Sequence, residues 1–541
     1  MSKITEYLRG KLTGEISTDP AVRADFARDG GILRETPQVI IFPRTTNDVR
    51  KVARFTWRLA ERSQVLPITA RGNGTSTTGA AIGRGAIISF AAHMSRILEL
   101  DVKSQMVRVQ PGLNFEALQE AMATHGLFLP IINGNLKVAT IGGALASNVA
   151  GTKSVKYGTL RDWTDRLEVV LANGEIIQTG RLSKHELNSK KGLQTMEGGI
   201  YRGLDALIDE NTDVIANFAD SAALNAGGFA IDLVKGSDGS FDLTPLLVGS
   251  QGTLGLITQA IVKLTPRPDD VLLISAAITA DQDLPALIEQ LLALKPSELE
   301  FIDGDTLKLI EQKDGGTAWK NVSGKRPDTL LFIEFDDKYR ARKVKKAAKI
   351  LDEAAVVDIK IASNWEEQET LRSIHHSVAT ITNYSERGTA ALPIAPDLAV
   401  APSQVLELTE TIKKLLHRNH IEGGIWGHLG AGVVSVRPLI NLANLGQRQA
   451  VFKLLGELLS AVSKLGGSMS GEFGDGRLLA PANKEQYGDK MAEIFTQIKA
   501  IFDPYNTLNP GVIVGTDQSD LLAILRQDYR EDRFAELNLR G

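Results

Sequence analysis

A glycine- and threonine-rich stretch places the strongest constraint on this chain. Residues 68–83 read ITARGNGTSTTGAAIG, with four glycines, four threonines and one serine directly after the apolar run VLPI. Such a segment has few side chains from which a hydrophobic core could form, so its backbone must serve another purpose. The pattern predicts a turn after a strand, whose amides and hydroxyls either converge on an anion or lie in solvent.

Two well-known phosphate motifs do not account for this stretch. A Walker A loop needs Lys and then Ser or Thr after its last glycine, but Ala80 and Ala81 occupy those positions. The dinucleotide pattern GxGxxG fails as well, because Thr77 stands where its third glycine belongs. Any anion bound here is therefore held in another way.

Composition excludes several classes of protein. The 541 residues carry a net charge of −4, which gives no basic footprint for nucleic acid. No apolar run reaches the roughly 18 residues of a membrane span, and Met1–Gly10 lacks the apolar core of a signal peptide. We expect a cytoplasmic protein, with peripheral contact at the inner face of a membrane left open.

Cysteine is absent from the chain. This excludes disulfides, cysteine-ligated iron–sulfur clusters, thiol catalysis and a cofactor linked through cysteine. A histidine that binds a metal or acts as a base must be one of only eight in the chain. They are His93, His125, His185, His375, His376, His417, His420 and His428.

The order of expected elements indicates an α+β fold. Residues 97–112 and 167–180 read as strand pairs, the second turning at Asn173-Gly174 in a type I′ turn. Between them, Asn114 is expected to cap a helix that ends at Gly126. A glycine turn and a β-branched strand follow in 246–266, and two buried-strand patterns, VLLISAAIT and TLLFIEFDD, come after a boundary at 265–270.

We expect a first domain over residues 1–268, a second over 269–500, and a C-terminal segment, 501–541, that returns to the first. Residues 484–502 read as one long amphipathic helix broken at Asp503-Pro504. The stretch 519–537 is helical in pattern, and we expect it to pack on its own molecule rather than bind a partner.

Three glycine-rich blocks, in this order and at these distances, resemble the FAD-binding flavoproteins of the vanillyl-alcohol-oxidase/PCMH type. They are residues 68–83, 130–177 and 248–258, and the likeness runs from about Pro37 to the terminal FDPYNTLNPG. Within that family the D-lactate/glycolate/D-2-hydroxyglutarate dehydrogenase branch is the most similar. The resemblance implies a two-subdomain FAD-binding domain and an α+β substrate, or cap, domain with an antiparallel sheet.

The resemblance also implies which residues surround FAD. The first block would wrap the pyrophosphate, the second would follow the flavin and ribityl chain, and the third would reach the adenine end. The residues concerned are Arg71, Gly72, Asn73, Gly74, Thr75, Ser76, Thr78, Gly79, Thr140, Gly142, Gly143, Ser147, Asn148, Gly151, Tyr157, Gly158 and Ile257. For Arg71, an exposed surface position is the competing interpretation. Some family members bind flavin covalently through histidine, but residues 65–92 contain none, so we expect non-covalent FAD.

The catalytic motifs of the branch are altered in this chain. Where relatives have HxGDGNxH, residues 427–435 read GHLGAGVVS, which keeps His428 but places Ser435 at the second metal-ligand histidine. Where relatives have GEHGxG, residues 471–477 read GEFGDGR, which keeps Glu472 but places Phe473 at the histidine taken as the base. One imidazole and one carboxylate are too few for a tight zinc or manganese site, so we expect no bound metal.

The loss of the expected base leaves the proton transfer open. Oxidation of a 2-hydroxy acid requires removal of the hydroxyl proton as hydride leaves for the flavin, and a phenyl ring cannot accept that proton. His428 or Glu472 could replace the base, or the two could be a residual hydrogen-bonded pair. Arg372 matches the arginine that holds the substrate carboxylate in relatives, the alternative being an exposed helix arginine. His375 and His376 do not fit a metal spacing, and we expect structural roles for them.

The sequence thus predicts an FAD-dependent oxidoreductase that oxidises a small 2-hydroxy acid, similar to D-lactate or glycolate, or a related hydroxylated substrate. Electrons would leave to oxygen, a quinone or a carrier protein, and a homodimer is left open. Two alternatives remain: a non-redox flavoenzyme of the alkyl-glycerone-phosphate synthase type, and a non-catalytic flavin-binding protein.

Overall fold

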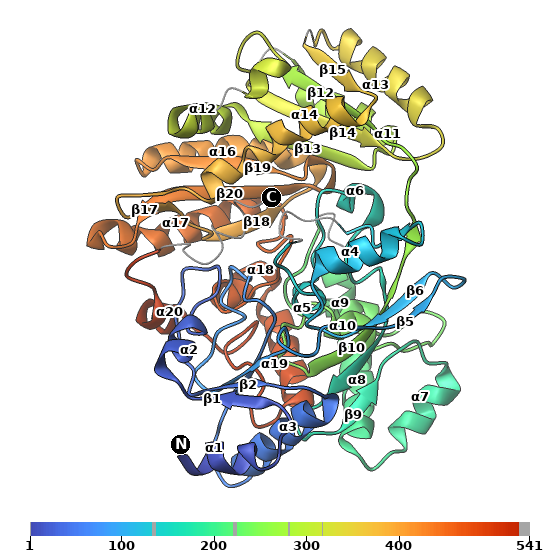
Figure 1. The fold of residues 1–541 in the computed structure, drawn as a ribbon, viewed down its shortest axis with the longest axis vertical. Helices are drawn as coiled ribbons and strands as arrows, with labels where there is room; N and C mark the ends of the chain where they lie inside the picture. Colours follow the sequence, from blue (N-terminus) through green and yellow to red (C-terminus); the bar gives the residue numbers. More distant parts are fainter. Residues whose placement is uncertain are drawn as a thin grey trace.

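A computed structural model describes residues 2–131, 137–219, 224–279, 282–315, 318–356 and 358–529. Residues 132–136 of the second glycine-rich block, and the part of the predicted C-terminal helix and C-terminal segment beyond residue 529, lie outside the described residues. Within those ranges the predicted α+β class is confirmed, with small sheets in a first domain and one large antiparallel sheet in a cap domain (Figure 1).

The first domain begins with a small sheet that carries the glycine-rich loop. Its strand order is β1 (Glu15–Ser17), β2 (Val39–Phe42), β4 (Ala86–Ser89), β3 (Ile68–Arg71), and its helices are α1 (Ser2–Arg9), α2 (Pro20–Asp25) and α3 (Thr46–Ala60). Strands β2 and β3 both pair parallel with β4. The loop therefore leaves the carboxyl end of a strand at the edge of this sheet.

A second, antiparallel sheet completes the first domain. Its strand order is β5 (Ile97–Asp101), β6 (Met106–Val109), β10 (Leu256–Lys263), β8 (Thr164–Val170), β9 (Ile176–Gln178). The surrounding helices are α4 (Phe115–Ala123), α5 (Ile141–Ala146), α6 (Ser154–Tyr157), α7 (Lys184–Lys191), α8 (Met196–Glu210), α9 (Thr212–Ala219) and α10 (Thr244–Leu247), and β7 (Leu127–Phe128) pairs with β11 (Thr265–Pro266). Burial alternates along β10, as expected for a strand with one face in the core.

The cap domain is built on the large antiparallel sheet. Its path is β15 (Ile359–Ala362), β12 (Leu272–Ile278), β14 (Thr329–Phe335), β13 (Glu298–Asp303), β19 (Gly423–Gly427), β20 (Val433–Asn441), β17 (Thr389–Ala391), β16 (Ser385–Glu386), with β18 (Ala395–Ala399) also paired to β20. Its helices are α11 (Leu284–Ala293), α12 (Gly304–Asp314), α13 (Arg340–Glu353), α14 (Trp365–His376), α15 (Ala379–Thr382), α16 (Val405–Arg418) and α17 (Leu445–Lys464). Every residue of β13 and β14 is buried, so their acidic side chains lie inside the protein.

The chain returns to the first domain earlier than the predicted residue 501. Helix α19 (Asp489–Phe502) contributes Ile494, Phe495 and Ile498 to the hydrophobic core of the first domain. In Figure 1 this red helix lies among the blue and green elements of the lower half. The predicted single helix over 484–502 is also wrong, because Gly488, with φ of +80°, separates α18 (Asn483–Tyr487) from α19.

The last described segment packs on the molecule itself, as far as residue 529. Helix α20 (Gln518–Ile524) ends before Arg526, whose guanidinium donates to the carbonyl of Gly31. The hydroxyl of Tyr529 donates to the carbonyl of Gly30 at 2.7 Å. The amide of Gly30 in turn donates to the carbonyl of Gly74, so this segment supports the glycine-rich loop from outside.

Two local predictions, a helix cap and a hairpin turn, have different outcomes. Asn114 caps α4 as predicted, accepting from the amide of Ala117 at 3.1 Å. The turn between β8 and β9 is not type I′, because Gly174 has a positive φ of 85° and Asn173 does not. The amide of Gly174 bonds to Leu171, which makes a longer loop with a left-handed glycine.

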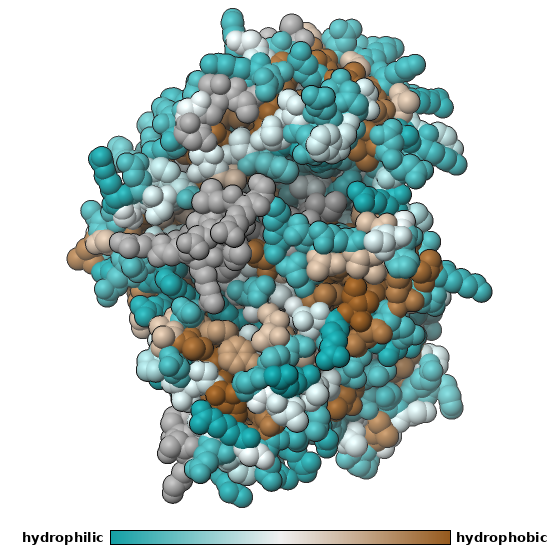
Figure 2. Space-filling view, in the orientation of Figure 1, coloured by the Kyte–Doolittle hydropathy of each residue, from teal (hydrophilic) through white to brown (hydrophobic). Residues whose placement is uncertain are grey.

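The surface of the described residues is mainly hydrophilic on the face shown in Figure 2, with hydrophobic residues gathered in patches over the lower half. In the part of the chain described above, no helix is long and apolar enough to cross a membrane.

Candidate functional site

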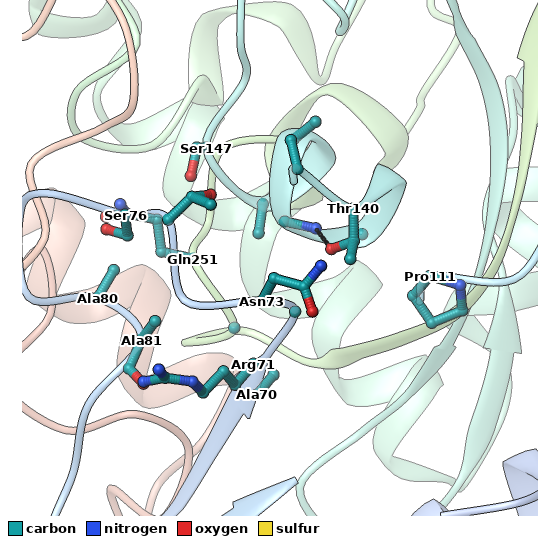
Figure 3. Close-up of a pocket in the computed structure, with 18 of the residues that line it drawn as sticks. Ala70, Arg71, Asn73, Ser76, Ala80, Ala81, Pro111, Thr140, Ser147 and Gln251 are labelled. Atoms are coloured by element: carbon teal, nitrogen blue, oxygen red, sulfur yellow. Dashed lines mark hydrogen bonds between the residues drawn. The ribbon is translucent and has the colours of Figure 1, made fainter. Parts of the chain in front are cut away.

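A cavity opens in the first domain, between the glycine-rich loop, α5 and the start of β10. Figure 3 shows Asn73 and Thr140 on one side of this cavity and Gln251 and Ser147 on another. Most of the residues predicted to surround FAD line it: Arg71, Gly72, Asn73, Gly74, Thr75, Ser76, Thr140, Gly142, Gly143, Ser147 and Ile257.

Bare backbone forms much of the cavity wall because side chains do not fit there. A Cβ on Gly72 would overlap Oγ1 of Thr140, and a Cβ on Gly142 would lie 2.5 Å from Cβ of Pro111. Thr140 caps α5 by accepting from the amide of Gly143 at 3.2 Å. A close approach of the main chain, with neutral donors nearby, suits a large anionic cofactor such as FAD.

Arg71 is not an exposed surface arginine. Its side chain is buried, and its guanidinium donates to the carbonyls of Ala81 and Arg28, each at 2.9 Å. Figure 3 shows it turned toward Ala81 and away from Thr140. A Cβ on Gly74 would overlap the same guanidinium. Arg71 therefore shapes the loop from beneath, in addition to lining the cavity.

The remaining predicted residues lie next to the cavity rather than on its wall. The carbonyl of Thr78 accepts from the amides of Arg477 and Leu478, and Gly79 packs on Leu33. Asn148, in the left-handed region with φ of +46°, accepts from the amide of Arg161 at 3.0 Å. These contacts fix the two ends of the glycine-rich blocks.

Gly151, Tyr157 and Gly158 lie where the first domain meets the cap domain. The amide of Gly151 donates to Oε1 of Glu472 at 3.0 Å. The hydroxyl of Tyr157 donates to Oδ2 of Asp336 at 2.7 Å, and Gly158 ends α6 with φ of +70°. Gly151 and Tyr157 therefore link the two domains.

The catalytic candidates His428 and Glu472 are brought together. Nε2 of His428 lies 3.3 Å from Oε1 of Glu472, and Nδ1 lies 2.6 Å from Oε2 of Glu300. Phe473, which follows Glu472, lines the cavity with a left-handed φ of +66°. Strain of this kind in a residue other than glycine persists where surrounding contacts enforce it, often at functional sites. Glu472 is therefore adjacent in sequence to a residue of the cavity wall, and the imidazole of His428 lies between two carboxylates.

The electrostatics of this group favour a charged imidazole. Burial lowers the pKa of His428, but Glu300 and Glu472 outweigh this effect and raise the pKa to about 10. Burial raises the pKa of Glu472 above its usual range, opposed by His428 and by the Gly151 amide. Burial likewise raises the pKa of nearby Asp397 to about 7. A protonated His428 is a hydrogen-bond donor, and the assignment of the base to His428 or Glu472 stays a prediction.

Arg372 lies on α14 within a buried ionic network. Its guanidinium forms an ion pair with Glu334, and its Nη1 lies 3.6 Å from Oε2 of Glu298. Lys153 of the first domain reaches the same Glu334. The arginine is about a quarter exposed (27%), so it is neither a free surface residue nor an uncompensated cation. Its predicted contact with a substrate carboxylate stays a prediction.

The residues that replace the metal ligands do not assemble a metal site. Ser435 donates to Oδ1 of Asp397 at 2.5 Å, so its hydroxyl is already engaged. Among the described residues, no group of three or more His, Asp or Glu side chains has an arrangement that could hold a metal ion. The expectation that the chain binds no metal stays a prediction.

Comparison with known families decides the affiliation. Residues 37–180 match the family described as "FAD binding domain", and residues 277–513 match "FAD linked oxidases, C-terminal domain". The chain belongs to the FAD-linked oxidases. The resemblance inferred from the three glycine-rich blocks is thereby confirmed.

Individual relatives are identical to this FAD-linked oxidase at about a quarter of the aligned positions. It is 28% identical to glycolate oxidase subunit GlcD of Bacillus subtilis, covering 89% of this chain and 90% of that protein. It is 27% identical to D-2-hydroxyglutarate dehydrogenase of Pseudomonas putida over 92% of this chain, but over only 50% of that protein. The chain thus spans half the length of the D-2-hydroxyglutarate dehydrogenases that it matches.

Solved structures extend the likeness of fold. An alkyldihydroxyacetonephosphate synthase has a TM-score of 0.62 and 15% identity, covering 94% of this chain and 84% of that one. At this identity the likeness shows the fold alone.

Sequence reasoning missed several residues of the FAD-linked oxidase site. Gln251 lines the cavity and joins the domains, donating to the carbonyl of Phe473 at 2.9 Å and accepting from the amide of Gly476 at 2.8 Å. Glu300 contacts His428, and Asp397 contacts Ser435. One sequence pattern could have indicated Glu300: acidic residues at alternate positions of an apolar strand, as in ELEFID. Such carboxylates are buried in the sheet and therefore require partners.

Proposed function

We propose that this chain binds FAD without a covalent bond and oxidises the CH–OH group of a small hydroxylated substrate. The single observation that carries the proposal is the position of Glu472, which bonds to Gly151 of the flavin block while its neighbour Phe473 lines the cavity. A proton acceptor thus lies directly next to residues of the expected cofactor wall. The names of relatives make 2-hydroxy acids, such as glycolate, the first substrates to test.

The two acid–base groups have different tasks in this proposal. The substrate loses the O–H proton to the Glu472 carboxylate and the C–H hydrogen as hydride, leaving a carbonyl product. Bound FAD supplies the acceptor for that hydride, which carries the two electrons. His428, held as a cation between Glu300 and Glu472, places a positive charge beside the reacting oxygen and limits negative charge on it. Because no residue in the glycine-rich loop can bond flavin covalently, contacts with the backbone and neutral side chains would hold it.

Arg372 and an electron acceptor complete the proposal. The guanidinium would face a substrate carboxylate only while it also neutralises Glu334 and Glu298. A strongly charged diacid is therefore expected to bind less well than a small monoacid or an uncharged alcohol. Oxygen, a quinone or a carrier protein would reoxidise the enzyme, and a homodimer and peripheral membrane contact are further proposals.

Anaerobic mixing of the FAD-loaded protein with glycolate, D-lactate, D-2-hydroxyglutarate, glycerol and lactamide tests the proposal. Loss of the oxidised flavin absorbance, with formation of the matching carbonyl compound, is the expected result for at least one of these. A flavin that stays oxidised throughout but forms an adduct with a substrate would indicate the non-redox alternative. If neither change occurs with any compound, the assignment as a CH–OH oxidase fails.

A further inference from the structure

Glu300 is a buried carboxylate that no motif of the family resemblance includes. It lies in the middle of β13, is 1% exposed, and places Oε2 at 2.6 Å from Nδ1 of His428. We propose that Glu300 is a positioning residue for the oxidation, which fixes the imidazole of His428 so that its Nε2 faces Glu472. This inference rests on the proposed function for its kinetic consequence, although the contact itself can be tested separately.

Hydrogen bonds fix the backbone of His428 but not its ring. The imidazole therefore needs such a partner. The carbonyl of His428 accepts from the amides of Ala431 and Val433, at 3.0 and 3.1 Å. Only the side-chain torsions then decide which ring nitrogen points to the reacting group. In histidines the hydrogen bond made by one nitrogen sets the role of the other. With Nδ1–H donated to Glu300, Nε2 is the atom left to face Glu472, at 3.3 Å.

The strand that carries Glu300 is suited to hold this geometry. β13 pairs with β14 on one side and with β19, the strand that leads directly to His428, on the other. Phe301 is opposite Gly427 in that register, so their sequence neighbours Glu300 and His428 lie close together across the two strands. A side chain on a central strand is displaced less easily than one on a loop, which makes the contact precise.

Burial supports a dedicated role for this carboxylate. Within the described part of the chain, Oε1 of Glu300 is buried and has no hydrogen-bond partner, so most of its compensation comes through Oε2. His375 is also nearby, and its Nε2 lies 3.5 Å from the same Oε2 without a hydrogen bond. A buried carboxylate with so few partners is costly to keep. Its contact with His428 accounts for its presence here.

Two variants and two measurements test this role. Glu300→Ala removes the acceptor, whereas Glu300→Gln keeps an acceptor oxygen without the charge. The measurements are the anaerobic flavin-reduction rate constant at saturating substrate, with the substrate Kd, and the downfield proton resonance of His428 Nδ1–H, assigned by its loss in His428→Gln. We expect Glu300→Ala to lower the rate constant by about 100-fold, as for a catalytic group moved by about 1 Å, with Kd and FAD content little changed.

The pattern across the variants separates positioning from a merely structural role. Glu300→Gln is expected to recover part of the rate, and the Nδ1–H resonance is expected to vanish in Glu300→Ala. Glu298→Ala, two residues earlier on the same strand face, should keep that resonance, and the exposed Glu410→Ala should keep both rate and resonance. An unchanged rate constant or a persistent resonance in Glu300→Ala would overturn the proposal. If no substrate reduces the wild-type flavin, the proposed function fails, and the resonance still decides whether Glu300 holds His428.

Discussion

The amide of Gly151 in the first domain donates a 3.0 Å hydrogen bond to Oε1 of Glu472 in the second. The same oxygen lies 3.3 Å from Nε2 of His428. The acid–base pair is therefore aligned with the wall of the cofactor cavity by a bond that crosses between the domains. Any change that opens this contact should disturb proton transfer more than cofactor binding.

Replacement of Glu472 tests its role as proton acceptor. Glu472→Gln preserves the shape of the side chain and can still accept from Gly151, but it cannot take up a proton. We expect the flavin-reduction rate constant to fall by about 10²–10⁴-fold, the usual worth of a general base, with FAD still bound. Stopped-flow absorbance gives the rate, and Glu493→Gln, an exposed glutamate of α19, is the matched control. A rate close to wild type would remove Glu472 from the mechanism.

The pH dependence of flavin reduction follows from the same two groups. Glu472 must be ionised to accept the proton, and burial raises its pKa, so the rate should rise with pH through a value above the usual range. His428 must be protonated to supply its positive charge, so the rate should fall again as pH passes its pKa of about 10. The expected profile is a bell with a broad neutral plateau. If His428 were the base instead, the rate would keep rising through pH 10.

The glycine at position 74 should be essential for cofactor binding. In Gly74→Asp, a Cβ would overlap the pinned guanidinium of Arg71 at φ of +74°, and a carboxylate would be added to the proposed pyrophosphate wall. We expect flavin content after purification to fall at least tenfold, while the cap domain stays folded by near-UV circular dichroism. Gly239→Asp is the control, because Gly239 has a similar φ of +78° but open space around it. Full flavin content in Gly74→Asp would refute the loop assignment.

The sequence could predict the features that are determined by residues close together in the chain. The cavity-lining glycines belong to continuous blocks, and the cap at Asn114 and the strands of the first domain follow from short-range patterns. The partner of His428 could not be predicted in this way. Glu300 is brought to it by the pairing of β13 with β19, which joins segments more than a hundred residues apart.

One difference has a specific physical cause. The predicted return of the chain at residue 501 is too late because α19 is amphipathic in either domain, and only packing shows that Phe495 completes the first core. The ion pairs of Arg372 with Glu298 and Glu334 could not be predicted either, because these partners come from two strands distant in the sequence. In both cases the tertiary environment, which no single segment encodes, decided the outcome.

The cofactor should be released when the protein unfolds. Residues 65–92 contain no histidine and the chain has no cysteine, so the loop lacks the side chains that attach flavin in covalent relatives. We expect acid or heat to free all of the yellow chromophore into the supernatant, where it is identified as FAD by chromatography. Flavin fluorescence that stays with the denatured chain on a gel would contradict this prediction, as would a colourless protein that does not bind added FAD.

Chelation should leave the enzyme unaffected, because the position of the second metal-ligand histidine is taken by Ser435. Its hydroxyl is neutral and already donates to Asp397, and the imidazole of His428 is engaged by Glu300. We expect substoichiometric metal by elemental analysis and an unchanged flavin-reduction rate after treatment with EDTA. Ser435→His is the informative comparison, since it restores an imidazole at the position of the second metal-ligand histidine of the family motif and should increase zinc binding. Stoichiometric metal in the wild-type protein, lost together with activity on chelation, would show that other ligands complete a site.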